Sequence, residues 1–176
     1  STLTHAEEFG WSTALGQLTA ISVLLVSVPL AWLARRNRWA AVLGWTGTLL
    51  GLAIPGPIIA LSLGRLFNQP NSDWLFYFYD RTLVLPWMAL MIRSFPFAFL
   101  VATFAVRRIP SHLLDAAAID GAGRSAQLRY IVLPQIGALI AGVWVVAFAI
   151  AVGDLSASIL AVPPGVTTVA IRIFNL

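Results

Sequence analysis

Residues 136–153 read IGALIAGVWVVAFAIAVG, a run without a single charged, amide or proline side chain. A helix that spans a membrane needs about 20 mostly apolar residues. Three further apolar runs of similar length occupy residues 13–34, 40–64 and 83–105. Together the four runs predict an all-α, polytopic membrane protein in which residues 1–176 form one transmembrane domain.

The composition also indicates a bilayer environment. Of the 176 residues, 59% are hydrophobic and only 10% are charged, with a mean hydropathy of +0.86. A soluble domain carries roughly 25% charged residues, so this chain has too few to cover a water-facing surface. It has no cysteine, which excludes disulfides and thiol chemistry, and its two histidines, His5 and His112, lie far apart. We therefore expect no metal, no cofactor and no catalytic residue.

The run 40–64 is interrupted by Ile54-Pro55-Gly56-Pro57. Proline lacks a backbone donor and glycine adds backbone freedom, so we expect a kink or a break there. An ordinary kinked span and a broken helix are both compatible with this pattern. Residues 65–82 are polar and aromatic, which is typical of a loop at the membrane interface. We expect interfacial positions for the tryptophans near span ends, which are Trp32, Trp39, Trp45, Trp74 and Trp87.

The placement of arginine predicts the topology. Segments 35–39 and 106–135 together hold seven arginines, whereas the loop 65–82 holds two. Because cytoplasmic loops are enriched in basic residues, we expect the first two segments in the cytoplasm and the N-terminus outside. Gln127 should then be open to cytoplasmic thiol reagents once it is replaced by cysteine. The start at Ser1 and the apolar C-terminal run lead us to expect a fragment of a longer chain.

The polar segment 106–135 has the pattern of two short helices. Pro110 and Ser111 predict a helix start with Ser111 as its N-cap. Residues 121–123 predict a turn, and a second helix from residue 124 should end at Pro134. The first helix carries a face of mostly small residues at helical spacing, made by Leu114, Ala117, Ala118 and Gly121. Such a face is suited to docking a cytoplasmic partner.

This segment resembles the EAA signature of binding-protein-dependent ABC importer permeases. The signature is Glu-Ala-Ala, three residues, Gly, nine residues and Ile-x-Leu-Pro. The chain has Asp115-Ala116-Ala117, Gly121 and Ile131-Val132-Leu133-Pro134 at the same spacing, with Asp115 in place of Glu. The resemblance implies a bundle like that of type I ABC importers. It also implies that Asp115, Ala116, Ala117 and Gly121 contact an ATPase subunit, and that Ile131, Leu133 and Pro134 hold the return into the membrane.

The resemblance implies a permease subunit of an ATP-driven importer, multi-pass in the bacterial inner membrane and not itself an enzyme. Its partners would be cytoplasmic ABC ATPase subunits, an extracytoplasmic substrate-binding protein, a second permease half or subunit, and the lipid bilayer, with no nucleic acid. Residues 153–176 are similar to iron(III)-type permeases, which suggests iron(III), although thiamine, sulfate, polyamine and phosphonate importers share the loop. The alternative class is a stand-alone channel or membrane scaffold.

Arg93 is the charged residue nearest the middle of a predicted span. A charge at that depth costs several kcal/mol unless it faces protein or water. It can line a transport path, form an ion pair with Asp154, or extend toward the interface beside Pro96. At a rise of 1.5 Å per residue, the depths of Arg93 and Asp154 differ by roughly 9 Å, so pairing would require helix tilt.

Overall fold

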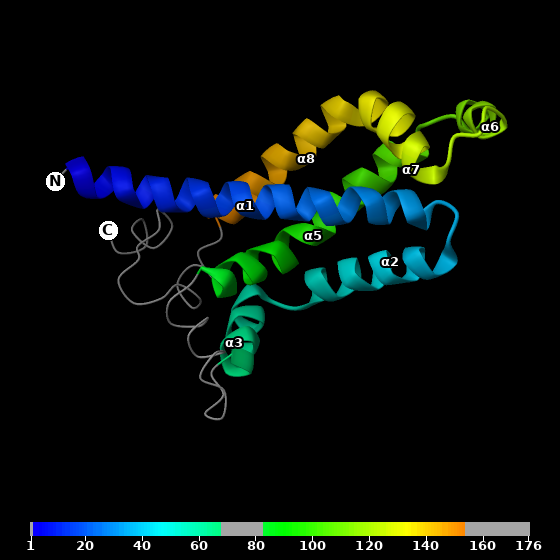
Figure 1. The fold of residues 1–176 in the computed structure, drawn as a ribbon. Helices are drawn as coiled ribbons and strands as arrows, with labels where there is room; N and C mark the ends of the chain where they lie inside the picture. The colour runs from blue at the N-terminus through cyan, green and yellow to red at the C-terminus, as the bar shows by residue number, and fades with distance from the viewer. Residues whose placement is uncertain (1, 68–82, 154–176) are drawn as a thin grey trace.

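The structure is a computed structural model that describes residues 2–67 and 83–153, and these residues are helical apart from short connections (Figure 1). This architecture confirms the predicted all-α class. The elements in chain order are α1 (Thr2–Ala34), α2 (Arg38–Ala53), α3 (Gly56–Phe67), α5 (Val84–Arg107), α6 (Ser111–Ile119), α7 (Arg124–Gln127), the π-helical turn η1 (Leu128–Val132) and α8 (Leu133–Gly153).

Within residues 2–67 and 83–153, three helical segments are long and apolar enough to cross a membrane. They are Ser12–Ala34 within α1, Val84–Arg107, and Arg124–Gly153, which runs from α7 through η1 into α8. The first two segments nearly coincide with the predicted runs 13–34 and 83–105, which are helical as expected, and their crossing of a membrane stays a prediction. Lipid offers the backbone no hydrogen-bond partners, so a single apolar segment in a membrane satisfies its N–H and C=O groups by forming a helix.

The predicted span 40–64 is not one straight helix. α2 ends at Ala53, α3 begins at Gly56, and the two helices are bent by 105°. Between them Ile54 is extended (φ −90°, ψ 121°), the conformation favoured before proline, and Pro55 has no N–H to continue α2. The predicted break is therefore confirmed, and the interpretation as an ordinary kinked span is wrong.

The bend sends α3 across one end of the bundle (Figure 1). α2 has 16 residues and so a length of about 24 Å, which is less than the hydrocarbon thickness of about 30 Å. α3 buries Ile59, Ala60 and Leu63 in the protein rather than continuing in the direction of α2. α3 also includes the first residues of the predicted loop 65–82, and the rest of that loop lies outside the described residues.

The last helical segment starts well before the predicted span 136–153 and passes through Pro134. The prediction that a separate short helix ends at Pro134 is therefore wrong. The turn before Pro134 is π-helical, and the N–H of Leu133 donates to the carbonyl of Leu128. Proline cannot donate to the carbonyl four residues earlier, and its ring would clash with it in an α-helix. The wider π-turn accommodates this proline, so the helix continues.

α5 is the central helix and packs against α1, α2, α3 and α8. Its two halves enter two different clusters of buried side chains. The cluster near α6, called the α6-end core, consists of Val28, Ala31, Trp32, Phe99, Ala102, Ala105, Val106, Ile109, Leu114, Val132 and Ile136. The cluster near α3, called the α3-end core, consists of Leu15, Ile59, Ala60, Leu63, Leu85, Ala89, Leu90 and Ala151.

The tryptophans predicted at the membrane interface do not share one environment. Trp32 is only 7% exposed and belongs to the α6-end core, so the interfacial interpretation is wrong for it. Trp39 and Trp45 are exposed, as an interfacial position requires, and Trp87 is half-buried. Trp74 lies outside the described residues. Position near the end of an apolar run therefore does not decide whether a tryptophan meets lipid or protein.

Candidate functional site

The predicted docking helix α6 projects beyond the end of the helix bundle (Figure 1). Leu114 is its one buried residue, fully enclosed in the α6-end core. Leu114 therefore fixes α6 to the bundle, and the prediction that it shares an open face with the small residues is wrong. The N-cap of α6 is Pro110 and not Ser111, because Pro110 is held extended (φ −62°, ψ 137°) and Ser111 is already helical.

The end of α6 is a turn that requires glycine. Gly121 has φ +81°, a left-handed conformation that side chains with a Cβ disfavour. The N–H of Gly121 donates to the carbonyl of Ala118 at 3.1 Å, and the N–H of Ala122 donates to the carbonyl of Ala117 at 2.9 Å. This pair of hydrogen bonds is a Schellman cap, which satisfies carbonyls at the helix end. The turn predicted at residues 121–123 is confirmed.

The residues of the signature lie in two places. Asp115, Ala116 and Gly121 are exposed on α6 and its turn, and Ala117 beside them is half-buried. The remaining residues of the signature lie where η1 meets α8: Ile131 is half-buried, and Leu133 and Pro134 are exposed. The structure thus gathers the first group at the tip of the segment and puts the second at its base.

Ile119 was not singled out by the sequence analysis. It is the last residue of α6 and its side chain is 87% exposed, more than any other large apolar side chain in the part of the chain that the structure describes. A single exposed apolar side chain is common on proteins, so Ile119 bears on function only together with the exposed signature residues beside it. The signal in the sequence is a large apolar side chain that follows three alanines, 116–118, and directly precedes Asp120 and Gly121.

Gln127 of α7 connects α6 to the turn that follows it. Its side chain is 3% exposed, and its Nε2 donates to the carbonyl of Leu114 at 3.3 Å and to that of Ala122 at 3.1 Å. The expectation that position 127 is open to thiol reagents is therefore wrong. A polar residue in a surface segment can be buried when nearby carbonyls accept its donors.

Replacing Gln127 by methionine, which has a similar length but no donor, is expected to loosen α6. Each of two carbonyls would lose a hydrogen bond, at a cost of about 0.5–1.5 kcal/mol per bond for the local structure. We expect faster amide hydrogen exchange across residues 111–121. Gln135→Met is the matched control, because Gln135 is exposed. Equal exchange rates in the two variants would contradict a fixing role for Gln127.

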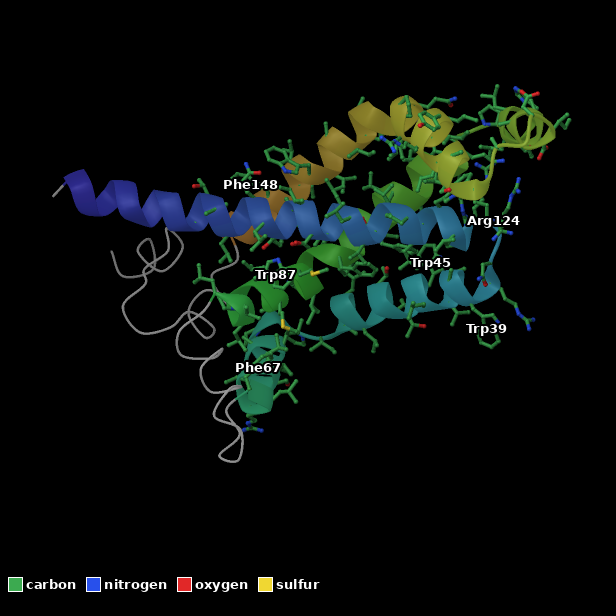
Figure 2. All side chains as sticks on the ribbon, in the orientation of Figure 1. Trp39, Trp45, Phe67, Trp87, Arg124 and Phe148 are labelled. Atoms are coloured by element: carbon green, nitrogen blue, oxygen red, sulfur yellow. The ribbon has the colours of Figure 1, made fainter. Side chains whose placement is uncertain are left out.

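Charged side chains surround the base of α6. Arg36 of the α1–α2 turn lies 3.5 Å from Asp115, and both side chains are substantially exposed. Arg36 and Arg124 line one small crevice together with Trp32 and Leu33. Figure 2 shows Arg124 at the same end of the bundle as the α1–α2 turn. This end therefore carries an exposed acidic side chain beside Arg36, and Arg36 shares a crevice with Arg124.

Arg93 is half-buried in α5. Asp154 lies outside the described residues, so the ion pair between them and the path-lining role of either stay predictions.

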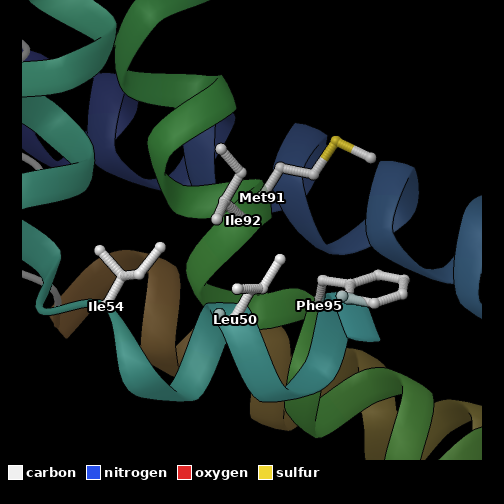
Figure 3. Close-up of a pocket in the computed structure, with 7 residues that line it drawn as sticks. Leu50, Ile54, Met91, Ile92 and Phe95 are labelled. Atoms are coloured by element: carbon white, nitrogen blue, oxygen red, sulfur yellow. The ribbon is translucent and has the colours of Figure 1, made fainter. Parts of the chain in front are cut away.

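An apolar pocket lies between α2 and α5 (Figure 3). It has a volume of about 310 Å³. Its lining is wholly apolar and consists of Gly47, Leu50, Gly51, Ile54, Met91, Ile92 and Phe95. Specific binding of a small polar molecule needs a few placed polar side chains, which this lining does not offer. The pocket is therefore a poor candidate for a substrate site.

Comparison with known proteins agrees with this arrangement. A galactooligosaccharides transport system permease protein of Bacillus subtilis is 38% identical over 104 residues, which are 50% of this chain and 24% of that protein. A putative ABC transporter permease protein of Streptomyces antibioticus is 28% identical over 74% of this chain and 54% of its own length. A putative 2-aminoethylphosphonate transport system permease protein of Salmonella paratyphi A is 25% identical over 94% of this chain and 63% of its own length.

In each of these relatives the matched region is less than two thirds of the protein's length. Residues 12–175 of the chain match the family described as "Binding-protein-dependent transport system inner membrane component". This match includes all the candidate spans and the whole of the α6 segment. The chain therefore belongs to the family of binding-protein-dependent transport system inner membrane components, which are multi-pass proteins of the bacterial inner membrane.

Proposed function

We propose that this chain is a membrane-spanning permease part of an ATP-driven importer and that α6 with its turn docks onto an ATPase subunit in the cytoplasm. The observation that carries the proposal is the position of α6. It projects past the bundle, exposes the signature residues Asp115, Ala116 and Gly121, and is held by one buried residue, Leu114. A helix presented in this way has surface to offer a partner and little role in closing the bundle.

The chemistry of this surface fits a shallow cleft in a protein partner. Small side chains allow the partner's backbone to approach closely, and Ile119 offers one large apolar contact at the tip. Interfaces draw most of their energy from a few such side chains near their centre. Asp115 adds a negative charge that a basic side chain of the partner can meet.

The attachment of α6 suggests how force passes into the membrane. Leu114 packs among side chains of α1, α5 and α8, and Gln127 binds the carbonyls on either side of the turn. Closure of two ATPase subunits on ATP binding would move α6, and these contacts would pass the movement to the spans. ATP hydrolysis itself belongs to the partner. An extracytoplasmic binding protein would deliver the substrate, and a second permease half would complete the path.

The names of the relatives bear on the substrate. Two relatives are named for transport of galactooligosaccharides and of 2-aminoethylphosphonate. Neither name supports iron(III), which rests on the resemblance of residues 153–176 alone. We propose that the binding protein sets the specificity, so binding of an oligosaccharide, a phosphonate and iron(III) to that protein is the direct measurement.

Co-purification tests the docking role of α6. The full-length permease should hold its co-expressed ATPase subunit, and Ile119→Asp should weaken this complex at least tenfold, because a charge replaces the central apolar contact. Ser125→Asp is the matched control, since it adds the same charge at an exposed position of α7. A permease that conducts substrate with no ATPase would instead support a stand-alone channel.

The topology can be tested at Ser125, which is exposed, instead of the buried Gln127. Ser125→Cys is expected to react with a membrane-impermeant thiol reagent only in inside-out vesicles, since the arginine count puts residues 106–135 in the cytoplasm. The sequence contains no other cysteine to interfere. Labelling from the outer face of intact spheroplasts would contradict the orientation.

A further inference from the structure

The turn between α1 and α2 is bonded to the segment that leads into α6. Arg35 of this turn is half-buried, and its two terminal nitrogens donate to two backbone carbonyls. Nη1 donates to the carbonyl of Val106 at 2.9 Å, and Nη2 donates to that of Ile109 at 2.8 Å. These carbonyls lie at the C-terminal end of α5 and in the link from α5 to α6.

The geometry of this contact suits arginine in particular. The last carbonyls of a helix have no partner within the helix, and a positive charge is favourable at that end. The planar guanidinium offers two parallel donors, so it can bind both carbonyls at once and fix their relative position. Val106 and Ile109 are themselves buried in the α6-end core. The contact therefore ties a surface turn to a packed part of the protein.

A second contact reaches α6 itself. Arg36 meets Asp115 at 3.5 Å, but exposure of both side chains keeps the stabilisation from this pair small. On the other side of the turn, the Asn37 side chain accepts the N–H of Trp39 at 2.9 Å and caps α2. Three consecutive residues of this turn thus contact three different elements. Arg35 binds the link before α6, Arg36 pairs with α6 itself, and Asn37 caps α2.

We propose that Arg35, assisted by Arg36, is a positioning residue that makes α6 move together with α1 and α2. This role rests on the proposed function of α6 as the docking helix. Leu114 packs α6 against α1, α5 and α8, and Gln127 connects α6 to its own turn, but neither residue reaches the α1–α2 turn or α2. The arginine contacts also join the α1–α2 turn to α6. A displacement of α6 would therefore be transmitted to α2 as well as to α1, α5 and α8.

The same turn provides a control for the simpler role of arginine in setting topology. Arg38 is exposed, and its guanidinium lies 5.2 Å from the ring centre of its neighbour Trp39. Arg35→Gln and Arg38→Gln each remove one positive charge from the same cytoplasmic turn. If Arg35 served only to retain that turn in the cytoplasm, the two variants would behave alike.

The first test measures the position of α6 and needs no ATPase. Spin labels at exposed Ala118 of α6 and exposed Val42 of α2, in the full-length permease in nanodiscs, report the distance between the two helices. We expect one narrow distance distribution for the unmodified pair and for Arg38→Gln, and a broad one for Arg35→Gln. Arg35→Lys retains the charge but loses the two-pronged contact, and it should also broaden the distribution. Identical distributions for Arg35→Gln and Arg38→Gln would overturn the proposal.

The second test measures transport in the reconstituted importer. Arg35→Gln should still bind the ATPase subunit and support hydrolysis, while substrate moved per ATP falls about tenfold or more, because the two charge-assisted hydrogen bonds that position α6 are lost. Arg38→Gln should stay within about twofold of the unmodified importer, since it breaks no such bond. Unchanged transport per ATP in Arg35→Gln would overturn the role in transmission. If the unmodified permease binds no ATPase, the proposed function fails, while the distance measurement still decides whether Arg35 positions α6.

Discussion

Gly44→Ala is expected to destabilise the bundle by about 1–3 kcal/mol, the usual cost of overpacking a buried site. A Cβ at Gly44 would overlap the ring of Phe99 on the facing helix α5. Phe99 is fully buried, and it stacks on Phe95 with ring centres 5.6 Å apart. Its edge-to-face contact with Trp45, at 5.9 Å, closes the other side. The ring has little room to move away, so α2 and α5 must separate.

Gly44 belongs to a buried face of α2 that also includes Thr48 and Gly51. A Cβ at Gly51 would come within 2.7 Å of Pro96 Cγ and 3.2 Å of the Ile92 carbonyl oxygen. Small residues at such spacing allow helices in membranes to approach until their backbones nearly touch. Gly44 and Gly51 therefore hold α2 close to α5, and the break at Pro55 follows directly after this contact.

Unfolding of purified full-length protein in mild detergent, followed by temperature and by denaturant, measures this effect. Gly142→Ala in α8 is the matched control, since its Cβ would meet nothing within 4 Å and the side chain would be exposed. We expect Gly142→Ala to be neutral or slightly stabilising. Adding Phe99→Leu to Gly44→Ala should recover part of the loss, because neighbouring changes do not add independently. A Gly44→Ala protein as stable as Gly142→Ala would contradict the contact.

Hydropathy predicted the helices at 13–34 and 83–105 well, but it did not predict the course of the chain through residues 40–64. The length of an apolar run indicates how many residues are removed from water, but it does not indicate the direction in which the helix runs. Pro55 marked the break in residues 40–64, but the 105° bend accompanies the packing of Ile59, Ala60 and Leu63 on the protein. Likewise, Pro134 was expected to end a helix, and the π-turn before it was not predictable from residue types alone.

At the candidate site, local features were predictable and long-range ones were not. The turn at Gly121 followed from residue types within a few positions. Arg35 and Val106 are 71 positions apart in the sequence, so no local sequence pattern predicts their contact. Polarity misled at Gln127, where a polar side chain is buried because it binds backbone carbonyls. Ile119 was overlooked because it lies outside the positions of the small-residue face, which are Leu114, Ala117, Ala118 and Gly121.

Gly121→Trp is expected to abolish ATP-driven transport while the permease still folds and inserts. Nothing lies within 4 Å of the position of a Cβ at Gly121, so the indole would extend into solvent and occupy space on the docking surface. The residue must also keep φ +81°, which costs a side chain about 1–2 kcal/mol and loosens the cap of α6. Substrate-stimulated ATP hydrolysis by the reconstituted complex measures the loss.

Two further variants separate the bulk of tryptophan from the strain of the turn. Gly121→Ala carries the same backbone strain with almost no bulk, and we expect it to weaken stimulation only partly. Gly123→Trp adds the same bulk two positions later, where φ is −66° and a Cβ again meets nothing within 4 Å, so it is free of strain. If docking involves the whole turn, Gly123→Trp should impair stimulation more than Gly121→Ala does. Normal stimulated hydrolysis in Gly121→Trp would show that no partner approaches this turn, since neither its strain nor its bulk could then matter.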